Sequence, residues 1–470
     1  MNKLPLSTTG KKILGDLYTP VGIYLRLRDR FRDTILLEST DHHVNENSYS
    51  FICINAIGGI EIKNYAELEY KMPSNDAVKQ AITADMNMPD YLWAYMNKFQ
   101  IEAPSDPSFK FAQGLYGYTC FDAVSFFDKV NAPQASDPTI PLIRYRLYQY
   151  VIAFNHFKDE LIICENKVPG ISGDLPMIES FIRSKDVPVY PFNLIGDEQS
   201  NLTDQAFISL VEKGIQRCLR GDVFQIVLSR QFQQTFSGDE FNVYRALRSI
   251  NPSPYLFYFD YGDYKIMGSS PEAQLILKQG KAIVHPIAGT FKRTGDDATD
   301  QQAAETLLED KKENAEHVML VDLARNDLSR VCDEVNVLHY RQVQYYSHVI
   351  HLVSEVEGKL RPSHNPFQIF AATFPAGTLS GAPKLKALEI IADYEPTNRS
   401  FYGGALGFVG FDGSFNHAIM IRTFLSKQNQ LICQAGAGVV AASNPSNELQ
   451  EVNNKLNALK QAAAIATQVH

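Results

Sequence analysis

The sequence predicts an α+β protein built in two lobes. Segment 142–154 is rich in β-branched and aromatic residues, which is typical of a strand, whereas the apolar residues of 204–220 recur with the period of an amphipathic helix. Both patterns recur along a chain of 470 residues that is 45% hydrophobic, enough for two substantial cores. Segment 185–205 is polar and contains prolines and a glycine. We interpret it as the link between an N-terminal lobe at 1–190 and a second domain at 200–470.

The composition argues against nucleic-acid-binding and membrane-spanning proteins. The net charge is −9 and the basic residues form no extended cluster, so no DNA or RNA partner is expected. No apolar run reaches the roughly 18 residues of a membrane span, and the N-terminal residues lack the apolar segment of a secretory signal. The six cysteines form no CxxC pair, which is typical of reduced thiols in a cytoplasmic protein.

Two pairs of glutamates share one spacing. Glu313 and Glu316 are three residues apart in a segment with helical character, and Glu448 and Glu451 repeat the spacing near the C-terminus. On a helix this spacing places both carboxylates on one face, where like charges repel by a few tenths of a kcal/mol. A solvated helix face would explain either pair alone. If the pairs meet, their oxygen ligands would suit a hard divalent cation such as Mg²⁺.

Several segments favour an anionic ligand. Arg422 interrupts the apolar stretch 418–425, which predicts an arginine buried in a strand, and such a charge needs a carboxylate partner. We favour a ligand over a protein carboxylate, because a buried ion pair within a protein gains little net stability. The small residues of 435–438, the turn at 289–290 and Lys455 would all accept an anion. Taken singly, the turn would be read as an ordinary strand end.

Two further side chains have more than one interpretation. Gln225 interrupts an apolar strand at 223–228, so it is either held by partners within the sheet or faces a cavity. His351 lies in the strand-like segment 349–353 and, considered alone, would be a hydrogen-bonded core histidine. The glycine-rich segment 374–384 opens a helix but lacks the spacing of a nucleotide-binding P-loop.

The longer motifs of the chain closely resemble those of the chorismate-utilising enzymes. In the C-terminal half they are PIAGT (286–290), AEHVMLVDLARNDLSR (315–330), HLVSEVEGKL (351–360), PAGTLSGAPK (375–384), IRT (421–423) and AGAGVV (435–440). The N-terminal segments TPVGIYLRL, LLES and GLYGY extend the resemblance over essentially the whole chain and point to the large subunits (component I) of anthranilate synthases. That family implies two lobes on large, mostly antiparallel sheets flanked by helices, the chorismate-binding α/β sandwich.

The resemblance implies a role for each matched residue. Glu316 and Glu451 match Mg²⁺ ligands, with Glu313 and Glu448 assisting directly or through water. Glu272 matches the general acid that protonates the departing C4 hydroxyl, and His351 matches the histidine needed to eliminate pyruvate. The positions that match the pocket around chorismate and its carboxylates are Gly289, Thr290, Thr378, Tyr402, Arg422, Gly436, Ala437, Gly438 and Lys455.

Regulation and partners are also implied by the resemblance. Ser39, Pro254, Tyr255 and Leu256 match a tryptophan-binding site between the lobes, although Leu256 stands where a methionine is frequent. None of the cysteines lies in a GxCxG nucleophile motif, so ammonia would come from a separate glutamine amidotransferase subunit (component II). The implied assembly is a heterotetramer that converts chorismate and ammonia to anthranilate and pyruvate.

Two positions discriminate among relatives. Members that form isochorismate or salicylate carry a lysine where this chain has Gln225, and an amide cannot activate water as a base. Many aminodeoxychorismate synthases carry a nucleophilic lysine where this chain has Ala288, whose methyl group cannot form the adduct. Anthranilate formation is therefore favoured. The alternatives are aminodeoxychorismate synthase component I and a non-catalytic chorismate-binding paralogue.

Overall fold

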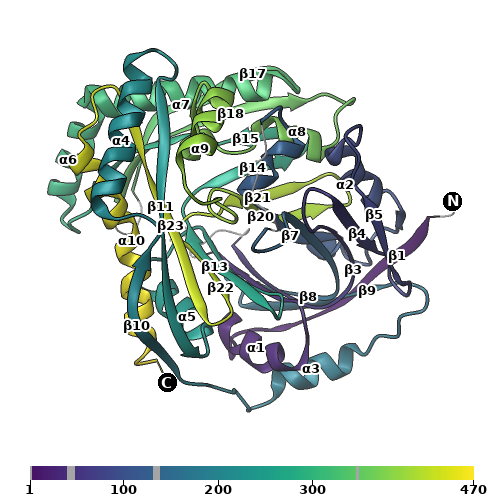
Figure 1. The fold of residues 1–470 in the computed structure, drawn as a ribbon. Coiled ribbons are helices and arrows are strands. Elements are labelled where there is room, and N and C mark those ends of the chain that lie inside the picture. Colours follow the sequence, from purple (N-terminus) through teal and green to yellow (C-terminus); the bar gives the residue numbers. More distant parts are fainter. Residues whose placement is uncertain (1–2, 40–47, 131–137, 346–348, 470) are drawn as a thin grey trace.

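The computed structural model describes residues 3–39, 48–130, 138–345 and 349–469 (Figure 1). At its centre is a long antiparallel strand pair, β3 (Tyr49–Ile62) and β8 (Ile143–Asn155). One series of antiparallel neighbours continues from β3 through β2 (Thr34–Glu38), β12 (Tyr255–Asp260), β13 (Tyr264–Ser270), β22 (Thr423–Lys427), β23 (Gln430–Val440), β11 (Gln225–Gly238) and β10 (Phe192–Ser200).

A second antiparallel series continues from β8. Its strands are β7 (Gly114–Thr119), β20 (Ala405–Gly410), β21 (Phe415–Ile419), β14 (Ala273–Lys278), β15 (Lys281–Val284) and β18 (Val349–Leu360), with β16 (Ile287–Lys292) and β17 (Cys332–Tyr345) both on β18. The remaining strands are β1 (Leu4–Leu14), β4 (Glu67–Lys71), β5 (Ala77–Ala81), β6 (Phe99–Ile101), β9 (Glu160–Lys167) and β19 (Gly381–Ala382). Among strand pairs of the described residues, only β1 with β6 is parallel.

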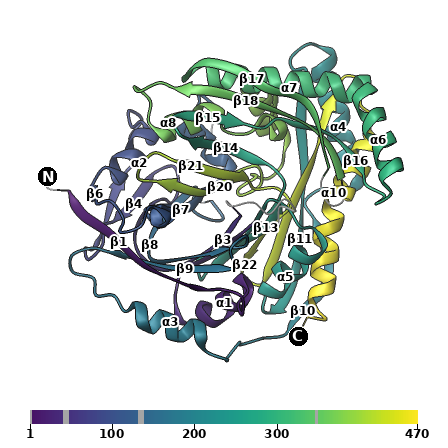
Figure 2. The ribbon, with the colours of Figure 1, turned by 180° about the vertical axis from the view of Figure 1, so that it is seen from behind.

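Helices cover the outer faces of both series. They are α1 (Pro20–Leu27), α2 (Met88–Met96), α3 (Leu175–Arg183), α4 (Asp204–Leu219), α5 (Phe241–Ile250), α6 (Asp297–Glu309), α7 (Lys311–Ser329), α8 (Pro366–Thr373), α9 (Lys384–Tyr394) and α10 (Pro445–Ala466). Helices α1 and α3 pack together near β9, and α10 runs beside α5 (Figure 2). No helix of the described residues is both long and apolar enough to cross a membrane.

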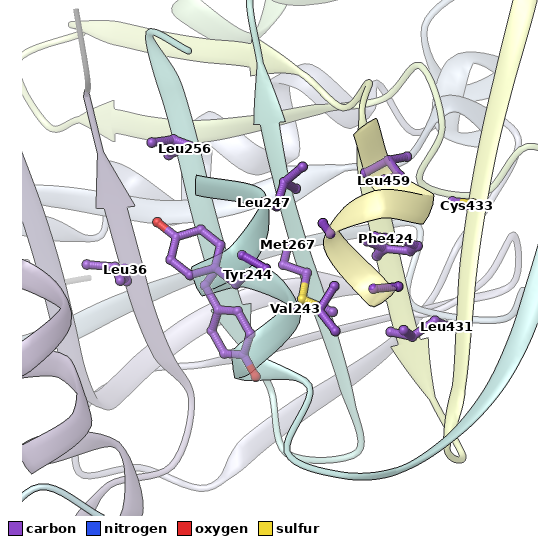
Figure 3. Close-up of a cluster of buried hydrophobic side chains, with 14 of the residues drawn as sticks. Leu36, Val243, Tyr244, Leu247, Leu256, Met267, Phe424, Leu431, Cys433 and Leu459 are labelled. Carbon is purple, nitrogen blue, oxygen red and sulfur yellow. The ribbon is translucent and has the colours of Figure 1, made fainter. Parts of the chain in front are cut away.

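Alternation along the strands produces separate apolar layers. Met267 of β13 faces α5 and α10, where it packs with Leu247 and Leu459, whereas its neighbour Ile266 faces the layer between the two series (Figure 3). In that middle layer the hydroxyl groups of Tyr118 on β7 and Tyr264 on β13 are 2.6 Å apart. A third cluster joins the second series to α2, α7 and α8. This sandwich of sheets between helices confirms the predicted fold class.

Local signals in the sequence account for several element ends. Helix α4 begins after Thr203, whose side chain accepts from the N–H of Ala206, and stops before Gly221, which has a φ of 80°. Helix α10 begins after Asn444, whose side chain accepts from two N–H groups, with Pro445 in the first turn. The six cysteines are free thiols, as predicted, and all of them are buried.

The segment that we interpreted as a link is not a plain linker. It contains β10, which lies at the edge of the first series and pairs with β11. Its residues are mostly exposed and polar, so they lack the apolar alternation that would have revealed a strand. Strands of the two halves also pair directly, β2 with β12 and β7 with β20. The division into 1–190 and 200–470 stays a prediction.

Candidate active site

The first glutamate pair lies on α7. The side chain of Asp310 accepts from the backbone N–H of Glu313 at 3.0 Å and so caps the first turn. Glu313 and Glu316 are both half-buried, while His317 is fully buried and hydrogen-bonds Ser354 at 2.6 Å. The two carboxylates therefore lie on a partly exposed side of α7 that faces the strands. The His317 side chain points into the core.

Each carboxylate of α7 lies next to a residue that the sequence analysis singled out. A Cβ added to Gly289 would lie 3.2 Å from Oε2 of Glu313, so this carboxylate abuts the turn of β16. Gln225 Nε2 donates to Oε1 of Glu316 at 3.3 Å. Gln225 is 3% exposed, and its Oε1 has no hydrogen-bond partner among the described residues. The side-chain amide of Gln225 thus extends from the start of β11 to α7. Its buried Oε1 is an acceptor that lies beside the acidic pair.

The glycines of β23 form a cradle opposite β11. Val227 pairs with Gly438, and Ser229 pairs with Gly436. A Cβ on Gly438 would lie 2.4 Å from Gln225 Nε2, so only a glycine lets the amide rest on the strand. A Cβ on Gly436 would approach the Tyr402 hydroxyl to 3.1 Å. We call residues 435–438 the glycine cradle, because the backbone is open to neighbouring groups along it.

The second glutamate pair lies on α10, on the other side of this cradle. Lys455 donates to the carbonyl of Gly436 at 2.9 Å and forms an ion pair with Glu451 at 2.6 Å. Glu451 is about half-exposed, whereas Glu448 is 4% exposed. The two glutamate pairs thus lie on either side of β23. Glu316 is connected to this strand through Gln225, and Glu451 is connected to it through Lys455. Among the described residues, no three acidic, His or Cys side chains form a metal-binding group.

Glu272 and Thr378 form a hydrogen-bonded pair at the end of β13. The Thr378 hydroxyl, in a short 3₁₀ turn (Gly377–Leu379), donates to Oε1 of Glu272 at 3.0 Å. Burial raises the pKa of the Glu272 carboxyl to about 7, although the bond from Thr378 and the nearby charges of Lys455 and Arg422 oppose the rise. A carboxyl group with this pKa is partly protonated near neutral pH and can act as a general acid.

Arg422 does not lie inside a strand, so that prediction is wrong. It occupies the break between β21 and β22, with a left-handed φ of 49°. The apolar residues on both sides of Arg422 belong to the ends of two different strands. In the sequence they therefore look like one continuous strand. Arg422 Nη1 donates to Oδ1 of Asn251 at 3.4 Å, and the carboxylate whose charge acts on the guanidinium is that of Glu272. Burial lowers the pKa of the guanidinium.

His351 is buried on β18, opposite the turn at 289–290. Its Nδ1 donates to the carbonyl of Gly289 at 2.7 Å, a geometry that assigns the proton of the neutral ring to Nδ1. Burial lowers the pKa of the imidazole below its usual 6.5, so it is neutral near pH 7. Gly289 has a φ of 69°, which suits a residue without a side chain. The backbone of Thr290 pairs with His351, but its side chain lies outside the described part of the chain.

The residues matched to the tryptophan site come together across the two halves. In the pairing of β2 with β12, Glu38 lies opposite Leu256, so Ser39 follows directly beside Tyr255. Glu38 is buried and accepts from the Tyr244 hydroxyl at 2.6 Å and from Arg248 at 2.9 Å. Leu256 is also buried. The contact of Asn251 with Arg422, four residues before Tyr255, was not predicted, although an Asn within the NPSP turn is a local signal for a fixed polar side chain.

Comparison with known proteins places this site in a family. Residues 59–461 match the model of the chorismate binding enzyme family, and the chain belongs to that family. It is 35% identical to anthranilate synthase component 1 of Aquifex aeolicus (strain VF5), over 99% of this chain and 95% of that one. It is 37% identical to the protein of the same name from Neisseria meningitidis (serogroup C, strain FAM18), over 98% and 95%.

Solved structures agree with this membership. The crystal structure of anthranilate synthase component I from Streptococcus pneumoniae TIGR4 superposes with a TM-score of 0.76 at 31% identity, covering 96% of this chain and 99% of that one. The menaquinone-specific isochorismate synthase of Escherichia coli superposes with a TM-score of 0.74 at 18% identity, covering 98% and 95%, and shares the fold.

Proposed function

We propose that this chain is the chorismate-converting component of an anthranilate synthase. It would combine chorismate with ammonia to give anthranilate and pyruvate. The single observation that carries the proposal is the pairing of Glu272 with Thr378 beside Arg422 and Lys455, because it puts a partly protonated acid next to two cations that suit a dicarboxylate. Relatives named anthranilate synthase component 1 match nearly the whole chain and support it.

Substrate binding would use the cations and the glycine cradle. Arg422 and Lys455 would pair with the carboxylates of chorismate, and Tyr402 and the backbone of 436–438 would orient the ring. The guanidinium of Arg422 is desolvated, donates to the amide oxygen of Asn251 and lies beside the partly protonated Glu272, so an anionic ligand would offset the cost of burying its charge. Lys455 already binds Glu451 and the carbonyl of Gly436, which leaves the third of its three N–H donors for a ligand.

In the first chemical step the C2–N bond forms and the C4–O bond breaks. Glu272 gives its proton to the departing hydroxyl, which leaves as water, and ammonia loses a proton after attack at C2. Thr378 fixes the orientation of the acid. Gln225 supplies an acceptor but no base strong enough to activate water, and Ala288 offers no amine for a covalent adduct. These two side chains favour ammonia at C2 over the competing reactions.

In the second step the C2 proton is removed and the C3–O bond breaks, which forms the aromatic ring and expels the side chain as the enolate of pyruvate. This enolate takes up a proton to become pyruvate. We assign the proton removal to His351. Its Nδ1–H is held by the carbonyl of Gly289, so the basic Nε2 carries the lone pair of a neutral imidazole. Ring aromatisation then supplies the driving force.

We also propose that Glu316 and Glu451 hold a Mg²⁺ ion, with Glu313 and Glu448 beside them. The donors are carboxylate oxygens on two sides of one cradle, and Mg²⁺ usually takes only one or two protein carboxylates and completes its shell with water and substrate. The buried acceptor on Gln225 adds a polar group next to Glu316. When bound, the ion would orient a substrate carboxylate and withdraw electron density from the ring.

The test is to mix the protein with chorismate, MgCl₂ and an ammonium salt and to follow anthranilate fluorescence. Product identity is confirmed by chromatography against anthranilate and 4-amino-4-deoxychorismate. Anthranilate that depends on ammonium is the expected result. Formation of 4-amino-4-deoxychorismate would assign the chain to the folate pathway instead, and binding of chorismate without turnover would identify a non-catalytic paralogue.

We propose further that a glutamine amidotransferase (component II) supplies ammonia and that the assembly is a cytoplasmic heterotetramer. The component 1 names of the relatives support a partner. Tryptophan would inhibit by binding at Ser39, Pro254, Tyr255 and Leu256, which the pairing of β2 with β12 brings side by side. Activity that stays flat as tryptophan is added would remove this regulatory claim, and sedimentation of the mixed subunits tests the assembly.

A further inference from the structure

One buried arginine outside the matched motifs contacts three parts of the candidate site. Arg399 follows α9 and is 1% exposed. Its guanidinium forms a two-pronged ion pair with Glu395, at 2.8 and 2.6 Å. The same group donates to the carbonyl of Leu379 at 2.5 Å and to the carbonyl of Val227 at 2.7 Å. The guanidinium therefore donates two of its hydrogen bonds to backbone carbonyls of separate elements.

Each of these backbone groups is next to a residue of the proposed mechanism. Leu379 directly follows Thr378, the donor to Glu272. Val227 lies opposite Gly438 in the pairing of β11 with β23. Glu395 extends the network, because its Oε1 also accepts from the backbone N–H and the hydroxyl of Ser229, at 2.8 and 2.7 Å, and Ser229 lies opposite Gly436. One cation thus fixes the acid's partner and both glycines of the cradle.

Aromatic rings complete the surroundings of the guanidinium. The Tyr402 ring lies 5.6 Å from it, and the Phe121 ring of the N-terminal half lies 4.6 Å from it. The next residue, Ser400, donates its N–H to the buried carboxylate of Asp122 at 2.9 Å. The network therefore reaches a fourth candidate residue, Tyr402, and anchors the segment on the other half of the chain.

Stability alone is a weak reason for such a pair. The desolvation of two buried charges largely cancels their attraction, so a well-packed apolar pair of equal volume would serve the core as well. A guanidinium differs in that its planar fork fixes several acceptors at once. We propose that Arg399 is a positioning residue for this reaction, which acts through Leu379 to orient Thr378 and through Val227 and Glu395 to hold the glycine cradle. The proposal rests on the proposed function.

The test is a double-mutant cycle with Arg399→Lys and Thr378→Val, measured as ammonium-dependent anthranilate formation over a range of pH. Lysine keeps the charge but cannot span the acceptors. A misplacement of about 1 Å can cost on the order of 100-fold, so we expect Arg399→Lys to lower kcat at least tenfold. Thr378→Val should lower kcat in the wild-type background. In the Arg399→Lys background the same substitution should change kcat by less than about twofold.

The pH profile provides a readout that a purely structural role would not move. The Thr378 bond stabilises ionised Glu272, so Thr378→Val should raise the pKa of the acid and shift the basic limb of the kcat profile to higher pH. Arg399→Lys should shift the limb in the same direction, and the double variant should shift it no further. Additive losses in kcat, or a basic limb unchanged by Arg399→Lys, would overturn the proposal.

Arg144→Lys is the matched control. Arg144 pairs with Glu61 at 2.7 Å, and both side chains are similarly buried, but the pair lies in the N-terminal half on β8 and β3. It should lower the melting temperature without moving kcat or the pH limb. If Arg399→Lys does not fold, Ser229→Ala removes the hydroxyl bond to Glu395 and the bond that this hydroxyl accepts from Gln434 Nε2, while the backbone N–H of Ser229 still donates to Glu395. A severalfold rise in KM for chorismate is then expected, and an unchanged KM would refute the role. Wild type without ammonium-dependent activity would instead refute the proposed function.

Discussion

Glu272→Gln should make the protein more stable and less active, and the gain in stability should depend on pH. The Glu272 carboxyl has its pKa raised from the usual 4.5 to about 7 by burial, so the folded state binds a proton there more tightly than the unfolded chain does. The folded state bears no penalty below pH 4.5. The penalty grows between pH 4.5 and 7 as the unfolded chain ionises first, and it is complete above pH 7.

The magnitude follows from the size of this change. Each tenfold change in proton affinity is worth about 1.4 kcal/mol, so the rise of the Glu272 pKa from 4.5 to about 7 makes its ionised form cost the folded state about 3 kcal/mol at pH 8. Glutamine has the same shape and can still accept from the Thr378 hydroxyl, so it removes this cost without a cavity. Chemical denaturation at pH 5 and pH 8 should show this full gain in the free energy of unfolding at pH 8 and less than about 1 kcal/mol of it at pH 5.

Activity should move in the opposite direction. An amide cannot donate the proton that the departing hydroxyl needs, so anthranilate formation should fall by roughly 100- to 10,000-fold. Wild-type kcat should decline as the pH rises through about 7, where Glu272 loses its proton. Equal stability of wild type and Glu272→Gln at pH 8, or a kcat that rises across that range, would show that Glu272 is not a buried acid of raised pKa. Glu69→Gln, at a half-exposed carboxylate on β4, serves as the control and should change neither quantity by much.

Four other outcomes are expected. Gly438→Ala places a methyl group 2.4 Å from Gln225 Nε2, so the amide must move and KM for chorismate should rise at least tenfold; an unchanged KM would mean that the cradle is not used. His351→Ala should stop the reaction after ammonia addition, and chromatography should detect a non-aromatic amino intermediate instead of anthranilate. Glu316→Gln should raise the Mg²⁺ concentration required for half-maximal activity by about tenfold, and direct titration calorimetry with Mg²⁺ should show the same weakening without substrate. Ala288→Lys should redirect or abolish anthranilate formation, which product chromatography would reveal.

Features determined by neighbouring residues were predictable from the sequence. The ends of α4 and α10 follow from capping residues. The hairpin of β20 with β21 follows from the dipeptide Asp412–Gly413 between them, which is typical of a tight turn. The helical spacing of Glu313 and Glu316 was also sufficient to place both carboxylates on one side of α7. In each case the cause lies within a few residues of the effect.

Features determined by distant contacts were not predictable in this way. Arg422 was placed inside a strand because hydropathy does not record the left-handed φ that separates β21 from β22. The identical spacing of Glu448 and Glu451 gave no sign that one would be buried and the other half-exposed, since that depends on what packs against α10. Arg399 was missed because each of its site contacts comes from a different part of the chain.

The pairing of β2 with β12 and of β7 with β20 constrains how the protein folds and where its chain can be truncated. A fragment limited to residues 200–470 would expose one edge of each of the six-residue strands β12 and β20, with N–H and C=O groups facing water, and such edges recruit other chains. Neither edge can be covered until the first third of the chain has been brought across the later strands. Folding therefore waits on contacts between residues more than 200 positions apart, which favours slow folding and a need for protection against aggregation during synthesis.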